Sequence, residues 1–142
     1  MIHIGIDPGA HTGFAVWSSA TREFLEIKTY RIDTALFRVL HYVELMGASQ
    51  VSVVFEDARQ RKFFEKERSL SEYRGKLMGA GSVKRDCKIW EDFLTAYGIK
   101  FWAKPPQKGA TKWEEAQFKA ATGWNGKTSE HARDAALLVW GM

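Results

Sequence analysis

Three carboxylates and one imidazole stand where they could do chemistry together. Asp7 and Glu56 each follow an apolar run, while His131 and Asp134 lie three residues apart near the end of the chain. Carboxylates gathered at one point repel one another unless a cation neutralises them. Mg²⁺ and Mn²⁺ take oxygen ligands and share them with substrate phosphates. The residue types therefore predict a centre for two divalent ions that hydrolyses phosphodiesters, with His131 as a ligand or a mobile proton carrier.

These residues need elements that bring them together. The run at residues 2–7 reads as a buried strand, and "VSVVF" at 51–55 is a continuous apolar run typical of a central strand. If the two strands pair in parallel, Asp7 and Glu56 meet at the same edge of the sheet. A final helix packed across that edge adds the histidine and the third carboxylate, which share one helical face.

The turn "DPGAHTG" follows the first strand. Its glycines indicate that the backbone approaches something closely, and the candidates are a phosphate or a metal ion that holds one. Structural interpretations stay open as well. Asp7 can simply cap the turn, Glu56 can reach solvent, and His131 can be a polar first-turn residue. Asp57 competes with Glu56, because the pleat of a strand sends neighbouring side chains to opposite faces.

The pattern of apolar residues predicts an α/β fold in a single domain, residues 1–142. The stretch 58–82 is the least regular, and it is either a loop or a loosely packed helix. The order of elements predicts a central mixed sheet of five strands flanked by helices. Strands are expected at 2–7, 13–18, 23–30, 51–55 and 99–103, and helices at 34–46, 83–97, 111–121 and 128–140.

The amino-acid composition indicates the kind of protein and the cellular compartment to expect. Of its 142 residues, 45% are hydrophobic and 27% are charged, which is typical of a globular domain. No apolar run approaches the roughly 18 residues that cross a bilayer. A single cysteine, Cys87, excludes an internal disulfide and fits a reducing compartment. We therefore expect a soluble, cytoplasmic protein with no membrane partner.

Charge is distributed unevenly along the chain. Residues 58–112 hold 14 Lys and Arg against 6 Asp and Glu, whereas the rest of the chain holds 7 basic and 11 acidic residues. A basic middle between acidic ends predicts a polyanion held against an acidic centre. A solvated helical face would give the same pattern.

Three segments resemble a known family. "IGIDPGAHTGFAVW" at the start, "VVFED" at the end of the fourth predicted strand and "SEHARDAALLVW" near the end of the chain are similar to the RuvC family of Holliday-junction resolvases. The resemblance implies the RNase H-like (retroviral integrase) fold. It also implies that Asp7, Glu56, His131 and Asp134 bind two Mg²⁺ or Mn²⁺ ions, histidine being a known alternative at its position. The family acts as a homodimer on four-way DNA junctions, and the helices at 34–46 and around Trp90 are candidates for the dimer surface.

The same resemblance suggests residues that contact DNA. An aromatic side chain shortly after the glutamate enters the junction in this family, and Phe63 and Phe64 stand in about that place, where they can also pack under a loop. Bases stack on aromatic faces while cations hold phosphates. The segment "WAKPPQKGATKW" resembles a loop that leads basic residues towards the cut. The expected DNA contacts are Arg59, Arg61, Lys62, Phe63, Phe64, Lys104, Lys108 and Lys112.

Other classes of protein compete with a resolvase that acts on Holliday junctions or other branched DNA. The phosphate turn of actin-like ATPases is similar to "DPGAHTG", but those proteins need two such domains to close over ATP. A YqgF-like member of the same superfamily would cut RNA. A branched-DNA-binding protein without catalysis would keep the basic middle, yet it has no reason to place Asp7, Glu56 and Asp134 at the ends of elements.

Overall fold

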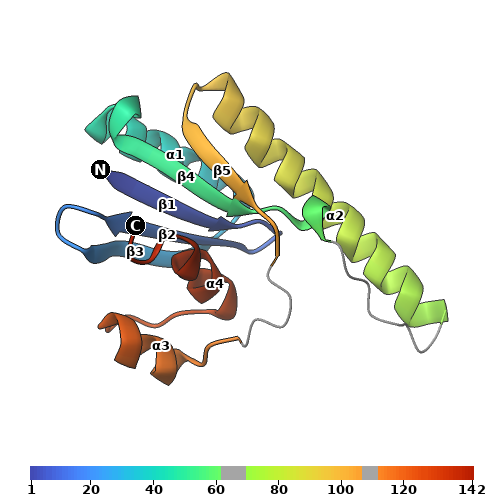
Figure 1. Cartoon of the computed structure of the whole chain (residues 1–142). Coiled ribbons are helices and arrows are strands. Elements are labelled where there is room, and N and C mark those ends of the chain that lie inside the picture. The colour runs from blue at the N-terminus through green and yellow to red at the C-terminus, as the bar shows by residue number, and fades with distance from the viewer. Residues whose placement is uncertain (62–69, 107–111) are drawn as a thin grey trace.

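The computed structural model describes residues 1–61, 70–106 and 112–142. Within them the chain forms five strands and four α-helices in an α/β arrangement (Figure 1). In chain order these are β1 (Ile2–Asp7), β2 (Thr12–Ser18), β3 (Glu23–Tyr30), α1 (Ile32–Met46), β4 (Val51–Glu56), α2 (Leu70–Ala96), β5 (Lys100–Lys104), α3 (Glu115–Thr122) and α4 (Glu130–Val139).

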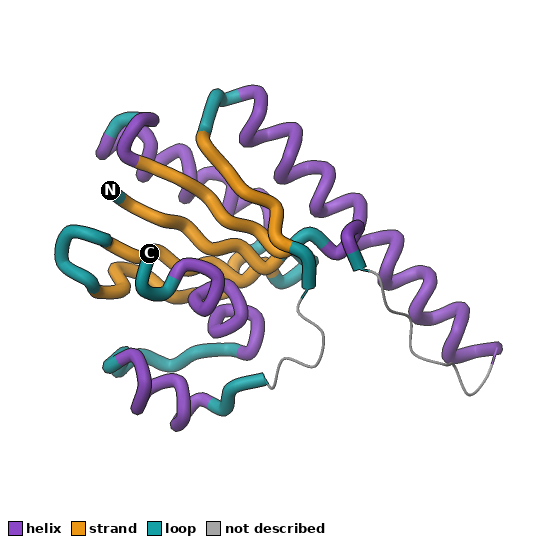
Figure 2. The backbone as a smooth tube through the Cα atoms, viewed as in Figure 1, coloured by secondary structure: helices purple, strands orange, loops and turns teal. Residues whose placement is uncertain are grey.

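The five strands make one mixed sheet in the order β3-β2-β1-β4-β5. β1, β2 and β3 form an antiparallel meander, whereas β4 pairs in parallel with β1 on one side and with β5 on the other. Helices flank both faces of the sheet (Figure 2). The prediction of a mixed five-stranded sheet is confirmed, and so is the parallel pairing of the two strands that end in Asp7 and Glu56.

Each face of the sheet has its own core, because side chains alternate along a strand. On one face the isoleucines of β1 and the odd-numbered residues of β4 pack against α1 and α2, with Trp90 fully buried among them. On the other face Ala15 and Val54 pack against Phe118 of α3 and Ala136 of α4. The face that carries α4 also receives Asp7 and Glu56, and this decides the geometry of the candidate site.

Helix α2 is much longer than the predicted helix at 83–97. It begins at Leu70 and has 27 residues, so most of the stretch expected to be irregular is helical where it is described. Its first half extends beyond the sheet (Figure 1) and carries Gly75, Gly79 and Gly81. The residues of α2 that pack into the core begin at Val83 and follow a 3.6-residue period. Among the described residues no helix, α2 included, is both long and apolar enough to cross a membrane.

The other predicted helices differ from the structure only at their ends. The helix expected at 34–46 begins at Ile32, and the one expected at 111–121 begins at Glu115. The last helix is shorter than 128–140 because Ser129 caps it, accepting a hydrogen bond from the backbone N–H of Ala132 at 3.1 Å.

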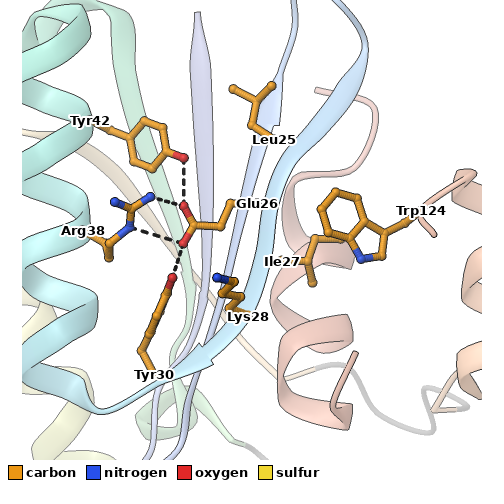
Figure 3. A pocket seen from close by; sticks show the side chains of 8 residues that line it. All are labelled: Leu25, Glu26, Ile27, Lys28, Tyr30, Arg38, Tyr42 and Trp124. Carbon is orange, nitrogen blue, oxygen red and sulfur yellow. Dashed lines mark hydrogen bonds and ion pairs between the residues drawn. The ribbon is translucent and has the colours of Figure 1, made fainter. Parts of the chain in front are cut away.

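Beside the edge strand β3 lies a hollow of about 430 Å³. Glu26 is buried in its wall and accepts hydrogen bonds from the hydroxyls of Tyr30 at 2.5 Å and Tyr42 at 2.9 Å, and from Arg38 (Figure 3). Burial favours the neutral carboxyl, but these donors outweigh it and hold the pKa of Glu26 below its ordinary value. The donors come from β3 itself and from α1, so the cluster joins this helix to the edge of the sheet.

Replacing Glu26 by Gln is expected to lower the stability of the fold. The change leaves Arg38 without its counter-charge, and breaking such a partly buried pair costs about 3 kcal/mol. Thermal unfolding at neutral pH measures the effect, with Glu23→Gln on the exposed side of the same strand as the matched control. Equal melting temperatures for the two variants would show that the cluster does not hold α1 to the sheet.

A candidate acidic active site at the β1–β4 edge

Helix α4 lies directly on the backbone of β1 and β2. A Cβ atom added to Gly13 would be 1.9 Å from the carbonyl oxygen of His131, and one added to Gly5 would be 2.0 Å from that of Ala135. No side chain fits at either position. At Gly13 the close approach predicted for a phosphate or a metal ion is therefore made by a helix of the protein itself, which corrects that prediction. Gly9 in the same turn is different, because a Cβ there would meet its nearest atom at 3.6 Å.

Asp7 and Glu56 stand side by side at the carboxyl ends of two neighbouring parallel strands. The β1–β4 pairing ends with Ile6 opposite Phe55, and the two carboxylates come one residue later. Asp7 lies two residues after Gly5, and Glu56 lies two residues after Val54. Since residues two apart in a strand share a face, both carboxylates belong to the face on which α4 packs. Parallel pairing together with strand parity thus gathers the two acids.

The first turn of α4 completes the group. Nδ1 of His131 lies 2.9 Å from Oδ2 of Asp7, and it is the donor because an ionised carboxylate only accepts. Ser129, which caps the helix, also contacts the hydroxyl of Thr29 on β3 at 2.5 Å. Arg133 donates to the carbonyl oxygens of Trp113 and Thr128. These contacts hold the start of α4 against the sheet edge where Asp7 ends β1.

Electrostatics confirm that the acids lie close together. Burial raises the pKa of Asp7, and the neighbouring Asp134 raises it further, while the hydrogen bond from His131 acts in the opposite direction. Burial likewise raises the pKa of Glu56, and the charges of Asp7 and Asp134 add to it. Neighbouring negative charge thus disfavours the ionised forms of Asp7 and Glu56, and such a group of carboxylates attracts cations.

Lys112 already supplies one cation at this edge. Its ammonium group pairs with Glu130 and lies 3.5 Å from Oδ2 of Asp134. The hydrogen bond with Glu130 raises the pKa of Lys112, and Asp134 contributes in the same direction. Lys112, predicted to contact the DNA backbone, lies within reach of the acidic group.

The oxygen-rich donor set suits Mg²⁺ or Mn²⁺, which prefer carboxylates. As the side chains stand in the described parts of the chain, no three His, Cys, Asp or Glu residues are close enough to form a ligand group. Asp7 is engaged by His131, and Asp134 by Lys112. Holding an ion would require these two contacts to open so that the oxygens turn towards a shared centre.

Asp57, the competitor of Glu56, has a structural role. It is buried and accepts hydrogen bonds from the backbone N–H and the guanidinium of Arg59, which in turn contacts Glu91 of α2 at 2.7 Å. Burial alone would raise the pKa of Asp57, but the contacts with Arg59 and Gln60 outweigh it and lower that pKa. Glu56 is thus the acid that faces α4. Arg59, predicted to contact DNA, instead links the end of β4 to α2.

Replacing Arg59 by Gln is expected to destabilise the fold by about 2 kcal/mol at neutral pH, since hydrogen bonds to a charged partner are lost. Because folding lowers the pKa of Asp57, its carboxylate stabilises the fold at pH values above its ordinary pKa of 3.8. This stabilisation is lost as the pH falls through the pKa that Asp57 has in the folded state. The stability gap between wild type and variant should therefore shrink in acid. A gap that stayed constant from neutral pH to pH 3 would contradict this assignment.

The remaining predicted DNA contacts divide into two groups. Arg61 is exposed, and its charge acts on Glu56. Lys104 stands opposite Glu56 in the register of β4 and β5, and its ammonium group donates to the carbonyl oxygen of Leu138 at 3.2 Å. Both cations therefore border the acidic edge. Lys62, Phe63, Phe64 and Lys108 lie outside the described residues.

Comparison with known proteins adds no relative. The sequence matches no protein-family model, and it has no significant match among curated proteins.

Proposed function

We propose that the chain is a metal-dependent endonuclease of the RNase H-like class that resolves Holliday junctions and other branched DNA, as the RuvC resemblance implies. One observation carries the proposal: parallel pairing of β1 with β4 brings Asp7 beside Glu56, and α4 places His131 within 2.9 Å of Asp7. Asp134, one turn further along α4, completes the acidic group through its charge. The order of strands and helices suits this class, in which the acids stand at the ends of adjacent strands.

Asp7, Glu56 and Asp134 are the residues that would hold two Mg²⁺ or Mn²⁺ ions, with His131 as a further ligand. Such ions supply an activated water and stabilise the leaving oxygen of the phosphodiester. The carboxylates bind and orient this centre. His131, more exposed than Asp7, is placed to hold or move a proton at Nδ1. Lys112 is placed to pair with the phosphate once it leaves Asp134.

The surroundings of the acidic edge suit a polyanionic substrate. Arg61, Lys104 and Lys112 border it, and the segment 58–112 carries most of the basic residues of the chain. Phosphate contacts position a nucleic acid without reading its sequence. Selectivity for a branch point would then come from shape, including Phe63 or Phe64 entering the junction.

We further propose that two copies associate through the first half of α2. Helical segments of this length with three glycines have little stability without packing. Leu70 and Met78 are exposed there, whereas the Trp90 face of the same helix is buried against the sheet. A dimer through this segment would present two acidic edges to a four-way junction, one for each of two strands. Equilibrium sedimentation of wild type and Met78→Glu tests the surface, since the variant should be monomeric.

A panel of substrates of matched sequence tests the function. With Mg²⁺ we expect paired nicks on a four-way DNA junction, weaker cleavage of other branched DNA and none of linear duplex. Cleavage of an RNA duplex in preference to the junction would favour the YqgF-like alternative. Tight junction binding without any nick, in Mg²⁺ and in Mn²⁺, would favour a non-catalytic binding protein.

A further inference from the structure

Strand β5 presents an exposed indole between two lysines. Phe101 and Ala103 face the core shared with α1 and α2, so Lys100, Trp102 and Lys104 point to the opposite face of the sheet. α3 and α4 lie over the other strands of that face, and neither lies in front of β5 in Figure 1. The β5 stripe, as we call Lys100, Trp102 and Lys104, is therefore open to solvent on the side that carries the acidic edge.

Trp102 is the centre of this stripe. It is 41% exposed, although its strand neighbour Val54 is completely buried. The ammonium group of Lys100 lies 4.9 Å from the centroid of the indole ring, within the range of a cation–π contact. At the other end of the stripe, Lys104 stands opposite Glu56 in the strand register, so the stripe leads directly to the acidic edge. Neighbouring side chains of the stripe are roughly 6.6 Å apart along the strand.

An aromatic face flanked by cations suits a particular partner. Unpaired bases stack on indole rings irrespective of their sequence, while lysines hold the phosphates on either side. A duplex does not offer this contact, because its bases are already stacked on one another. A plain apolar cover for Val54 would not require a lysine on each side of the ring.

We propose that the β5 stripe binds single-stranded DNA, with a base on Trp102 and phosphates at Lys100 and Lys104. When DNA binds, the ammonium group of Lys100 leaves the indole ring of Trp102 and contacts a phosphate instead. The proposal rests on the proposed nuclease function for its choice of DNA, and it narrows the substrate to branched DNA with an unpaired arm or gap beside the cut. The strand would run along β5 towards Glu56.

Fluorescence anisotropy with a labelled oligothymidylate in EDTA tests the stripe without any cleavage. Trp102→Leu keeps an apolar cover over Val54 but removes the aromatic face, and it is expected to weaken binding by about 5- to 100-fold. Trp102→Phe should retain most of the affinity. Trp140→Leu is the matched control, because Trp140 is 39% exposed and its ring packs instead against Trp113 at 5.9 Å.

The lysines give a second readout. Lys100→Gln and Lys104→Gln should each lower the slope of log affinity against log salt by about 0.7, the value for one phosphate contact of a single strand. Unchanged affinity in Trp102→Leu, or equal losses in Trp102→Leu and Trp140→Leu, would overturn the proposal. So would salt slopes equal to that of wild type in both lysine variants, and circular dichroism checks that every variant is folded.

The nuclease function and single-strand binding by the β5 stripe can be tested independently of each other. If the nuclease function is wrong, four-way junctions stay intact in Mg²⁺ whatever happens to the oligothymidylate in EDTA. If only the stripe is wrong, wild type cuts junctions while Trp102→Leu binds single strands as well as wild type does.

Discussion

Replacing Asp7 by Asn is expected to reduce junction cleavage at least about 1000-fold while junction binding stays within a few-fold of wild type. The asparagine has the same shape but offers one neutral oxygen in place of the charged pair, and the loss of metal-based stabilisation amounts to several kcal/mol. The expected phosphate contacts, Arg61, Lys104 and Lys112, are unchanged. Single-turnover cleavage in Mg²⁺ and gel-shift titration in Ca²⁺ measure the two quantities.

The same change should not destabilise the protein. The raised pKa of Asp7 means that the folded state resists its ionisation, so at neutral pH its charge works against folding. Asp57→Asn is the matched control, because Asp57 stands next to Glu56 but contributes through Arg59. It is expected to lower the melting temperature and to leave the rate per folded molecule unchanged. If Asp7→Asn instead unfolded the protein, or lost junction binding, the acidic edge would be structural.

Replacing Gly13 by Ala is expected to damage both the fold and the site. Its Cβ would lie 1.9 Å from the carbonyl oxygen of His131, so α4 must move away from the sheet. Such overpacking against backbone costs about 3 kcal/mol or more, which corresponds to roughly a 10 °C lower melting temperature. A displacement of about 1 Å in the positions of His131 and Asp134 is enough to slow cleavage by roughly 100-fold.

Gly9→Ala supplies the control within the same turn. Gly9 has no left-handed backbone conformation, and an added Cβ would make only an ordinary contact at 3.6 Å. Stability and rate should both stay near those of wild type. If Gly13→Ala behaved like Gly9→Ala in thermal unfolding and in cleavage, α4 would not need to lie against β2, and the account of how His131 reaches Asp7 would be wrong.

Much of the fold could be predicted because burial leaves a periodic trace in the sequence. β1 and β4 were predicted as buried strands and as candidates for neighbouring central strands, and they do pair in parallel. The first half of α2 could not be found in this way. The side chains described there, such as Leu70 and Met78, are exposed, and three glycines lower the helix propensity of the segment.

The acidic residues of the candidate site could be predicted from the sequence, but the residues that hold the surrounding elements in place could not. Strand parity and the i, i+3 spacing of His131 and Asp134 are local properties, and the pairing of β1 with β4 then brings Asp7 beside Glu56. The role of these residues as a metal site stays a prediction. The role of Arg59 is not local, because Glu91, its second partner, lies 32 residues away. A run of basic residues gives no sign of which member is already paired inside the fold.

Cleavage of an end-labelled four-way junction, in Mg²⁺ and in EDTA, tests the central claim most directly. The account predicts nicks at symmetric positions on two opposing strands in Mg²⁺ and intact strands in EDTA. If folded protein that binds the junction leaves every strand intact in Mg²⁺ and in Mn²⁺, or cuts equally well in EDTA, then Asp7, Glu56 and Asp134 are not a metal-dependent nuclease centre.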